Sequence, residues 1–178
     1  MNVTGALYFI IEAIFSIAMA IVFTRFMLQV ARADFYNPFS QFIVKATSPI
    51  LNPLRKVVPS FGGIDNASLI LVILLMALKL TLLFVFFSNG PFSGAQFVFT
   101  LFLSLFHALL EYLLWIVIIT VILSWVGPGN PNTVVFFQLA EPILAPIRKV
   151  MPDTGMFDLS PLVVLLLIGA LRILVGSL

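Results

Sequence analysis

Four ionisable side chains of this sequence lie inside long apolar runs, where a charge has no ready access to water. They are Glu12, Lys79, Glu111 and Arg172. At the centre of a membrane helix each such charge costs about 2.5–3.5 kcal/mol to insert. Counting residues from the ends of the runs places each acid at the depth of a base, so the sequence predicts the pairs Glu12–Lys79 and Glu111–Arg172. Such pairs either fix helix packing or line a path for protons or ions.

His107 lies one helical turn before Glu111, so the two side chains share a helix face. This spacing suits a weak proton relay, or a histidine that is hydrogen-bonded to a neighbour. The chain has no cysteine and no other histidine, which excludes disulfides and a His-rich metal site. It also lacks a glycine-rich phosphate loop and a nucleophile elbow. We therefore expect no catalysis, no cofactor and no metal.

A stretch of seventeen residues occurs twice in the chain. It reads PILNPLRKVVPSFGGID from Pro49 and PILAPIRKVMPDTGMFD from Pro142, at one constant offset (142 − 49 = 93). Ten of the seventeen positions are identical without a gap. The chain is therefore predicted to consist of two copies of one unit of about ninety residues. We divide it at 1–89 and 90–178.

The composition is that of a membrane protein. Of the 178 residues, 62% are hydrophobic and 9% are charged, whereas soluble domains carry about 25% charged residues. The net charge of +2 is too small to indicate nucleic-acid binding. Lipid offers no partner to backbone polar groups, so apolar runs of about 20 residues predict membrane-spanning helices. We expect an all-α fold with four spans, at about 5–28, 66–87, 95–126 and 159–178.

The repeated motif connects the first span to the second and the third to the fourth. In the first copy Asn37 and Pro38 suit the N-cap and first position of a helix, and apolar residues then recur at helical spacing. This pattern predicts an amphipathic helix that lies in the membrane interface. We call each motif-bearing connection an elbow. The prolines that follow are expected to end that helix and fold each elbow into short turns. They are Pro49, Pro53, Pro59, Pro142, Pro146 and Pro152.

Lys and Arg are distributed unevenly around the expected spans. Seven of the nine lie in or beside the two motif loops, and the termini and the central connection carry none. The positive-inside rule therefore predicts that both motif loops are cytoplasmic and both termini are outside. The two helical hairpins would then be parallel repeats, related by an axis along the membrane normal.

The elbows carry the other candidate site residues. Arg55, Lys56, Arg148 and Lys149 either set the topology or bind anionic lipid or a cytoplasmic protein partner. Asp65 and Asp158 precede the second and fourth spans. These two carboxylates either cap the helices or pair with the nearby Arg-Lys.

The doubled motif P-I-L-x-P-[LI]-R-K-V-x-P resembles the YggT/YlmG family, together with FYNPFSQF from Phe35 and QLAEPILAPIRKVMP from Gln138. The resemblance covers nearly the whole chain. It implies an integral protein of the bacterial cytoplasmic membrane without enzymatic activity or catalytic residues. It also implies links to osmotic stress tolerance and potassium homeostasis, to cell division and nucleoid distribution, and in plastids to cofactor attachment during cytochrome assembly.

Two functions remain open at this point. The first is a non-enzymatic membrane scaffold or accessory factor whose elbows bind lipid and a protein partner. The second is a transporter of cations such as potassium or protons, or an accessory to one, that uses the intramembrane charges. A homo-oligomer is compatible with either function, and direct binding of nucleic acid is not expected.

Overall fold

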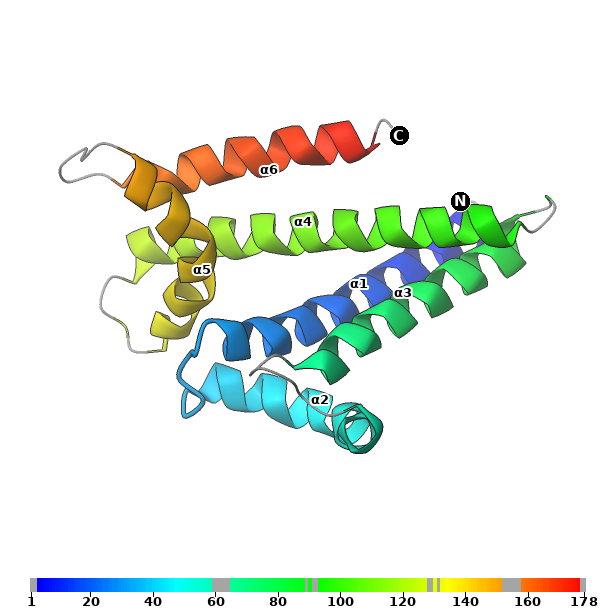
Figure 1. Ribbon diagram of the computed structural model, residues 1–178, viewed down its shortest axis with the longest axis horizontal. Coiled ribbons are helices and arrows are strands. Elements are labelled where there is room, and N and C mark those ends of the chain that lie inside the picture. The colour runs from blue at the N-terminus through cyan, green and yellow to red at the C-terminus, as the bar shows by residue number, and fades with distance from the viewer. Residues whose placement is uncertain are drawn as a thin grey trace.

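The computed structural model describes residues 3–58, 65–88, 90, 93–127, 130, 132–151 and 158–176 (Figure 1). The regular structure of these residues is entirely helical, which confirms that the fold is all-α. The helices are α1 (Val3–Val30), α2 (Pro38–Val57), α3 (Asn66–Phe87), α4 (Gly94–Val126), α5 (Val134–Val150) and α6 (Ser160–Gly176).

Three of these helices, α1, α3 and α4, are long and apolar enough to cross a membrane. The described part of α6 has 17 residues and is a shorter apolar helix. The four apolar runs expected from the sequence thus coincide with α1, α3, α4 and α6. Helix α4 has 33 residues and a length of about 50 Å, which exceeds a hydrocarbon layer of about 30 Å.

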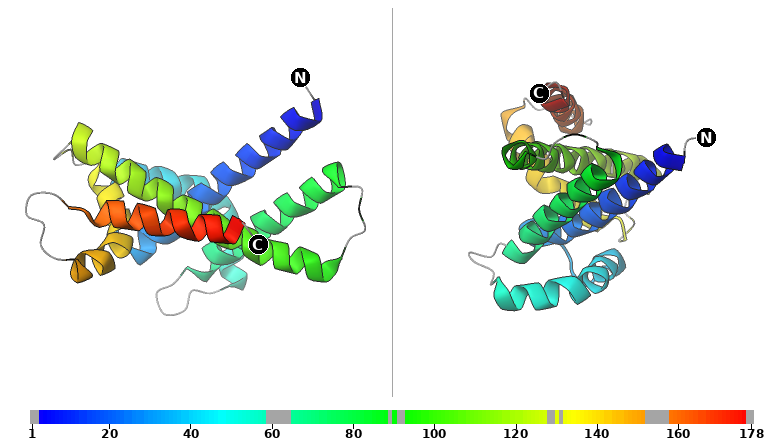
Figure 2. Two further views of the ribbon diagram at one scale, coloured as in Figure 1. Left: turned by 90° about the horizontal axis from the view of Figure 1, so that it is seen from above. Right: turned by 90° about the vertical axis from the view of Figure 1, so that its right-hand side faces the viewer.

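The long helices pack in two pairs, α1 against α3 and α4 against α6 (Figures 1 and 2). The pairs join where α4 contacts α1 and α3. At this junction Phe23 of α1 stacks on Tyr112 of α4, with ring centres 5.4 Å apart. Both side chains are buried. Since each pair comes from one copy of the repeat, the core combines two similar hairpins.

Helices α2 and α5 lie at the same end of the bundle. The start of α1, the end of α3, the start of α4 and the end of α6 point toward the other end (Figure 1). Helix α2 packs against α1 and α3, and α5 packs against α4, α6 and α1. The motif helices, which carry five of the Lys and Arg residues, are therefore separated from the uncharged connection by the length of the bundle.

Asn37 begins α2 as the sequence predicts. Its side-chain oxygen accepts a hydrogen bond of 2.9 Å from the backbone N–H of Phe39, and Pro38 occupies the first helical position. The cap satisfies a backbone donor that has no partner within the helix, and proline has no such donor to satisfy.

The expectation that prolines fold the elbows into short turns is wrong for four of the six. Pro49 and Pro53 lie inside α2, and Pro142 and Pro146 lie inside α5. Pro59 and Pro152 fall outside the described residues.

The helices bend where the sequence predicted that they would end. In Figure 1 the first half of α2 lies across the view and its last turns are seen end-on. Prolines four residues apart share one helix face, so one bend relieves the clash of both rings with the preceding turn. Just before the first of them, the hydroxyls of Thr47 and Ser48 donate to the carbonyl oxygens of Ile43 and Val44, at 2.7 and 2.5 Å.

Candidate functional site

The last turn of α2 is tied to the start of α3 by an ion pair between Arg55 and Asp65. Arg55 Nη2 lies 2.5 Å from Asp65 Oδ2, and Arg55 Nε lies 3.4 Å from Asp65 Oδ1. The hydroxyl of Ser68 donates to the same carboxylate at 2.6 Å. The Asp65 side chain is 0% exposed, so its charge depends on these partners.

The environment of Asp65 favours its ionised form. Burial acts to raise the pKa of the carboxyl, but the hydrogen bonds from Arg55 and Ser68 outweigh it, so the pKa lies below its usual value. Removing either donor would leave a buried acceptor without its partner.

The same ion pair recurs in the second repeat, because Arg148 and Asp158 follow Arg55 and Asp65 by 93 positions (55 + 93 = 148, 65 + 93 = 158). Arg148 Nη2 lies 2.9 Å from Asp158 Oδ2. Arg148 Nη1 also contacts Glu141 at 3.2 Å, a partner for which the first repeat has Ser48. We call the pairs Arg55–Asp65 and Arg148–Asp158 the arginine clasps.

The two clasps differ in exposure. The side chains of Arg148, Asp158 and Glu141 are 47%, 45% and 55% exposed. Burial acts to raise the pKa of Asp158, but hydrogen bonds from Ser160 and the contact with Arg148 outweigh it, so the pKa lies below its usual value. Water screens this second clasp far more than the first.

The two aspartates differ in whether they cap the following helix or only pair with arginine. Asp158 both pairs with Arg148 and caps α6, because its Oδ1 also accepts a hydrogen bond of 2.9 Å from the backbone N–H of Ser160 at the start of that helix. Asp65 occupies the N-cap position of α3, but its side chain makes no capping hydrogen bond. Of the two alternatives for Asp65, the pair with Arg55 is present, and no hydrogen bond from the Asp65 side chain caps α3.

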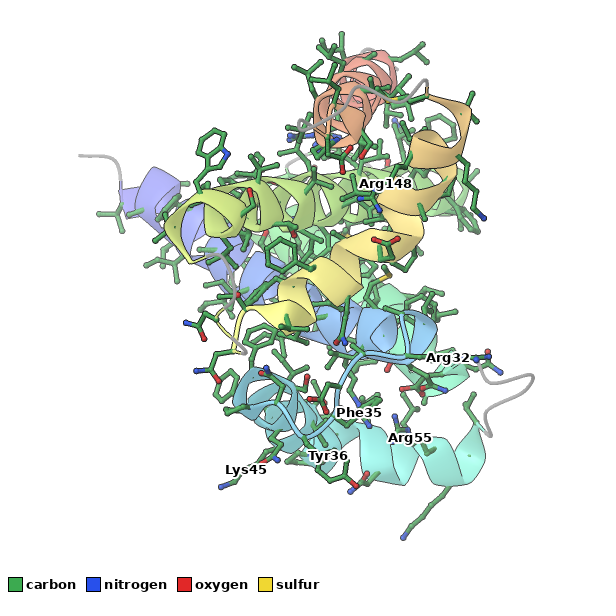
Figure 3. All side chains as sticks on the ribbon, turned by 90° about the vertical axis from the view of Figure 1, so that its left-hand side faces the viewer. Arg32, Phe35, Tyr36, Lys45, Arg55 and Arg148 are labelled. Carbon is green, nitrogen blue, oxygen red and sulfur yellow. The ribbon has the colours of Figure 1, made fainter. Side chains whose placement is uncertain are left out.

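Each clasp arginine is followed by an exposed lysine, Lys56 in α2 and Lys149 in α5. Neither lysine forms an ion pair within the described part of the chain. The view onto this end of the molecule shows Arg55 and Lys45 on α2 and Arg148 on α5 (Figure 3). Each elbow therefore combines an arginine that pairs with an aspartate of this chain and an exposed lysine that is available to bind another molecule.

The intramembrane charges come together in the predicted combinations. Lys79 Nζ of α3 lies 2.6 Å from Glu12 Oε2 of α1. Arg172 Nη2 of α6 lies 4.0 Å from Glu111 Oε1 of α4, a much looser contact. His107 is half-buried, and no hydrogen bond joins it to Glu111. Among the described residues, no group of three or more His, Asp or Glu side chains could hold a metal ion.

The family of the chain follows from comparison with known proteins. The profile of the CCB3/YggT family matches residues 4–86 and again residues 99–178. The chain belongs to the CCB3/YggT family. Its two matches agree with the internal repeat, and each contains one arginine clasp.

Relatives in this family span nearly the whole chain. A Vibrio alginolyticus protein named for the proC 3' region is 45% identical over 175 residues, covering 97% of this chain and 95% of the relative. A Pseudomonas aeruginosa relative is 44% identical, covering 97% and 88%. Escherichia coli K12 YggT is 36% identical over 165 residues, covering 92% and 86%. No solved structure matches the chain.

The two CCB3/YggT repeats also contact each other directly at the elbow end. The backbone N–H of Asp34 donates to Gln138 Oε1 at 2.9 Å. The rings of Phe39 in α2 and Phe136 in α5 lie 4.7 Å apart. The sequence did not predict these contacts, because residues about a hundred positions apart meet through tertiary packing and leave no periodic pattern in the sequence.

Proposed function

We propose that this protein is a non-enzymatic scaffold of the bacterial cytoplasmic membrane. In this proposal α1, α3, α4 and α6 are four spans, and the clasped helices α2 and α5 lie along the cytoplasmic face. The observation that carries the proposal is the repeated arginine clasp, which holds a bent basic helix against the following apolar helix in both repeats. A scaffold of this kind suits the division and nucleoid roles that the family resemblance implies.

The proposed contact with the membrane is made by Lys56 and Lys149. Each lysine follows an arginine that is already neutralised by aspartate, so the lysine carries the positive charge available to an anionic lipid headgroup. A lysine near an anionic leaflet contributes about 1 kcal/mol of binding free energy. Exposed apolar residues on α2, such as Phe42 and Ile50, would enter the acyl boundary beside it.

The topology can be tested by cysteine labelling, because the chain has no cysteine of its own. We expect Lys45→Cys on α2 to react with a membrane-impermeant maleimide after permeabilisation of spheroplasts, but not before. Gly90→Cys in the central connection should react in intact spheroplasts. The reverse pattern would place the elbows outside and contradict the proposal.

Lipid binding can be tested on purified protein by measuring how much phosphatidylglycerol it retains. The double variant Lys56→Gln/Lys149→Gln should bind this lipid roughly thirtyfold more weakly, since two lysine contributions are lost. The matched variant Lys56→Arg/Lys149→Arg keeps the charge and should retain it. Lys45→Gln removes one charge from the exposed face of α2 and serves as the control for position. Equal retention by the glutamine and arginine variants would refute the role of these lysines.

A cation transporter or transport accessory is the second candidate, and the contact between Lys79 and Glu12 inside two candidate spans favours it. Purified protein in liposomes should then carry a potassium or proton flux that Lys79→Ala abolishes. Absence of flux at high protein density, with the protein shown to be folded and oriented, would leave the pair with a packing role.

A further inference from the structure

A cavity of about 250 Å³ lies between α1 and α4, near the middle of both candidate spans. Helix α1 lines it with Ser16, Met19 and Phe23, and α4 lines it with Glu111, Tyr112 and Trp115. Its walls are mostly apolar, and Glu111 is the charged side chain among them. Ligand sites in proteins commonly combine an apolar pocket with a few polar groups in this way.

Glu111 is incompletely neutralised by its neighbour. Arg172 reaches it from α6, which packs on α4, and its Nη2 stays 4.0 Å from Oε1. The Glu111 side chain is 47% exposed, and its second oxygen, Oε2, makes no ion pair with a described residue. A carboxylate in apolar surroundings gains strongly from a further positive charge.

The remaining walls suit a cation better than an anion. The rings of Phe23 and Tyr112 are stacked and buried, and Trp115 is 54% exposed at the rim. Aromatic faces attract cations through the negative potential above the ring, most strongly for tryptophan. A carboxylate and three aromatic rings around one cavity therefore favour a positively charged guest with an apolar body.

We propose that this cavity binds an organic ammonium ion that enters from the lipid-facing surface between α1 and α4. Ile17 and Trp115, which line the cavity, are both more than half exposed at that surface. An apolar guest would reach the opening through the bilayer, and Glu111 would fix its charged group. An uncharged apolar guest is the alternative, because the walls alone would accept it.

The test uses Trp115 as a reporter. The chain has two tryptophans, so Trp125→Phe leaves Trp115 as the sole source of indole fluorescence. This variant is reconstituted into liposomes of phosphatidylcholine, whose zwitterionic headgroups carry no net charge to concentrate cations. Benzyltrimethylammonium should change the Trp115 emission saturably. Neopentylbenzene has the same shape with carbon in place of the charged nitrogen, and it should bind at least about tenfold more weakly.

The Glu111→Gln variant should bind benzyltrimethylammonium about tenfold more weakly, because the charged partner is lost. Asp34→Asn removes an exposed acid outside the cavity and should leave the affinity unchanged. Circular dichroism checks that each variant is folded. Equal binding of the cation and its neutral isostere to the Glu111 protein would overturn the proposal even if Glu111→Gln failed to fold. A linear, unsaturable response to the cation would overturn it as well.

Discussion

Arg55 Nη2 lies 2.5 Å from Asp65 Oδ2, and the same pair of residue types meets again 93 positions later in Arg148 and Asp158. In each repeat the arginine lies in the last turn of a bent helix, and the aspartate precedes the next apolar helix. The pair therefore fixes where the elbow meets the span. The two copies differ in burial, and this difference predicts unequal contributions to stability.

Asp65→Asn should destabilise the protein more than Asp158→Asn. The first substitution strips Arg55 of its buried charged partner, a loss of about 3 kcal/mol for buried pairs. The second leaves Arg148 with Glu141 in a well-exposed cluster, where a pair contributes at most about 1 kcal/mol. Thermal unfolding in detergent measures both, and Glu141→Gln is the matched control. Equal losses for the two aspartates would contradict the burial difference.

The stability of the first clasp should depend on pH in the acid range. The folded-state pKa of Asp65 lies below its usual value of about 3.9, so its stabilisation is present above that value. The stabilisation is lost as the pH falls from there through the lowered pKa. Melting temperatures of wild type and Asp65→Asn should draw together as the pH is lowered from 6 to about 2. A constant difference over this range would show that Asp65 does not titrate as proposed.

The sequence predicts the helical framework well because lipid leaves few alternatives. The runs 66–87 and 95–126 coincide with α3 and α4 almost to the residue, since breakers and polar residues bound them on both sides. The N-cap at Asn37 was equally predictable, because one polar side chain before a proline has a clear local role. Counting residues from the ends of the spans also predicts the pair of Lys79 with Glu12, because it places the two side chains at the same depth in the membrane.

The elbows were harder to predict because their structure depends on tertiary contacts. A proline forbids an ideal helix, but it permits a bent one when neighbouring helices support the bend, as at Pro49 and Pro53. The choice between capping and pairing at Asp65 stayed open for the same reason. The carboxylate of an aspartate before a helix can accept from the first backbone N–H groups of that helix. At Asp65 the guanidinium of Arg55, ten residues earlier, competes for the same carboxylate. Sequence spacing alone does not rank these two partners.

The two intramembrane pairs should show unequal coupling in double-mutant cycles. Glu12→Lys and Lys79→Glu should each destabilise the protein by about 3 kcal/mol, and the swapped double variant should recover most of the loss. For Glu111 and Arg172, the longer contact of 4.0 Å, against 2.6 Å for Lys79 and Glu12, predicts a smaller coupling. Unfolding titrations in mixed detergent give both coupling energies. A larger coupling for Glu111 with Arg172 would be the contradictory result.

Replacing the internal prolines should straighten α2. Pro49→Ala/Pro53→Ala restores two backbone N–H donors and removes the ring clashes, so the helix can regain its ordinary hydrogen bonds. Spin labels on cysteines at Gln41 and Lys56 should then move apart, as measured by double electron–electron resonance. The same labels with Pro38→Ala, which changes a position outside the bend, should keep the wild-type distance. An unchanged distance in the double variant would show that packing, and not proline, sets the bend.

Arg32 ends α1 in a conformation that glycine adopts more readily. Its φ of 48° is left-handed, and the N–H of Ala33 donates to Leu28 O at 3.0 Å while the N–H of Arg32 donates to Gln29 O at 3.2 Å, the bonds of a Schellman cap. A side chain in this region costs about 1 kcal/mol. Arg32→Gly should therefore be more stable than Arg32→Ala by about that amount, since both variants lose the same charge. Thermal unfolding compares the two, and a more stable alanine variant would show that the left-handed turn carries no strain.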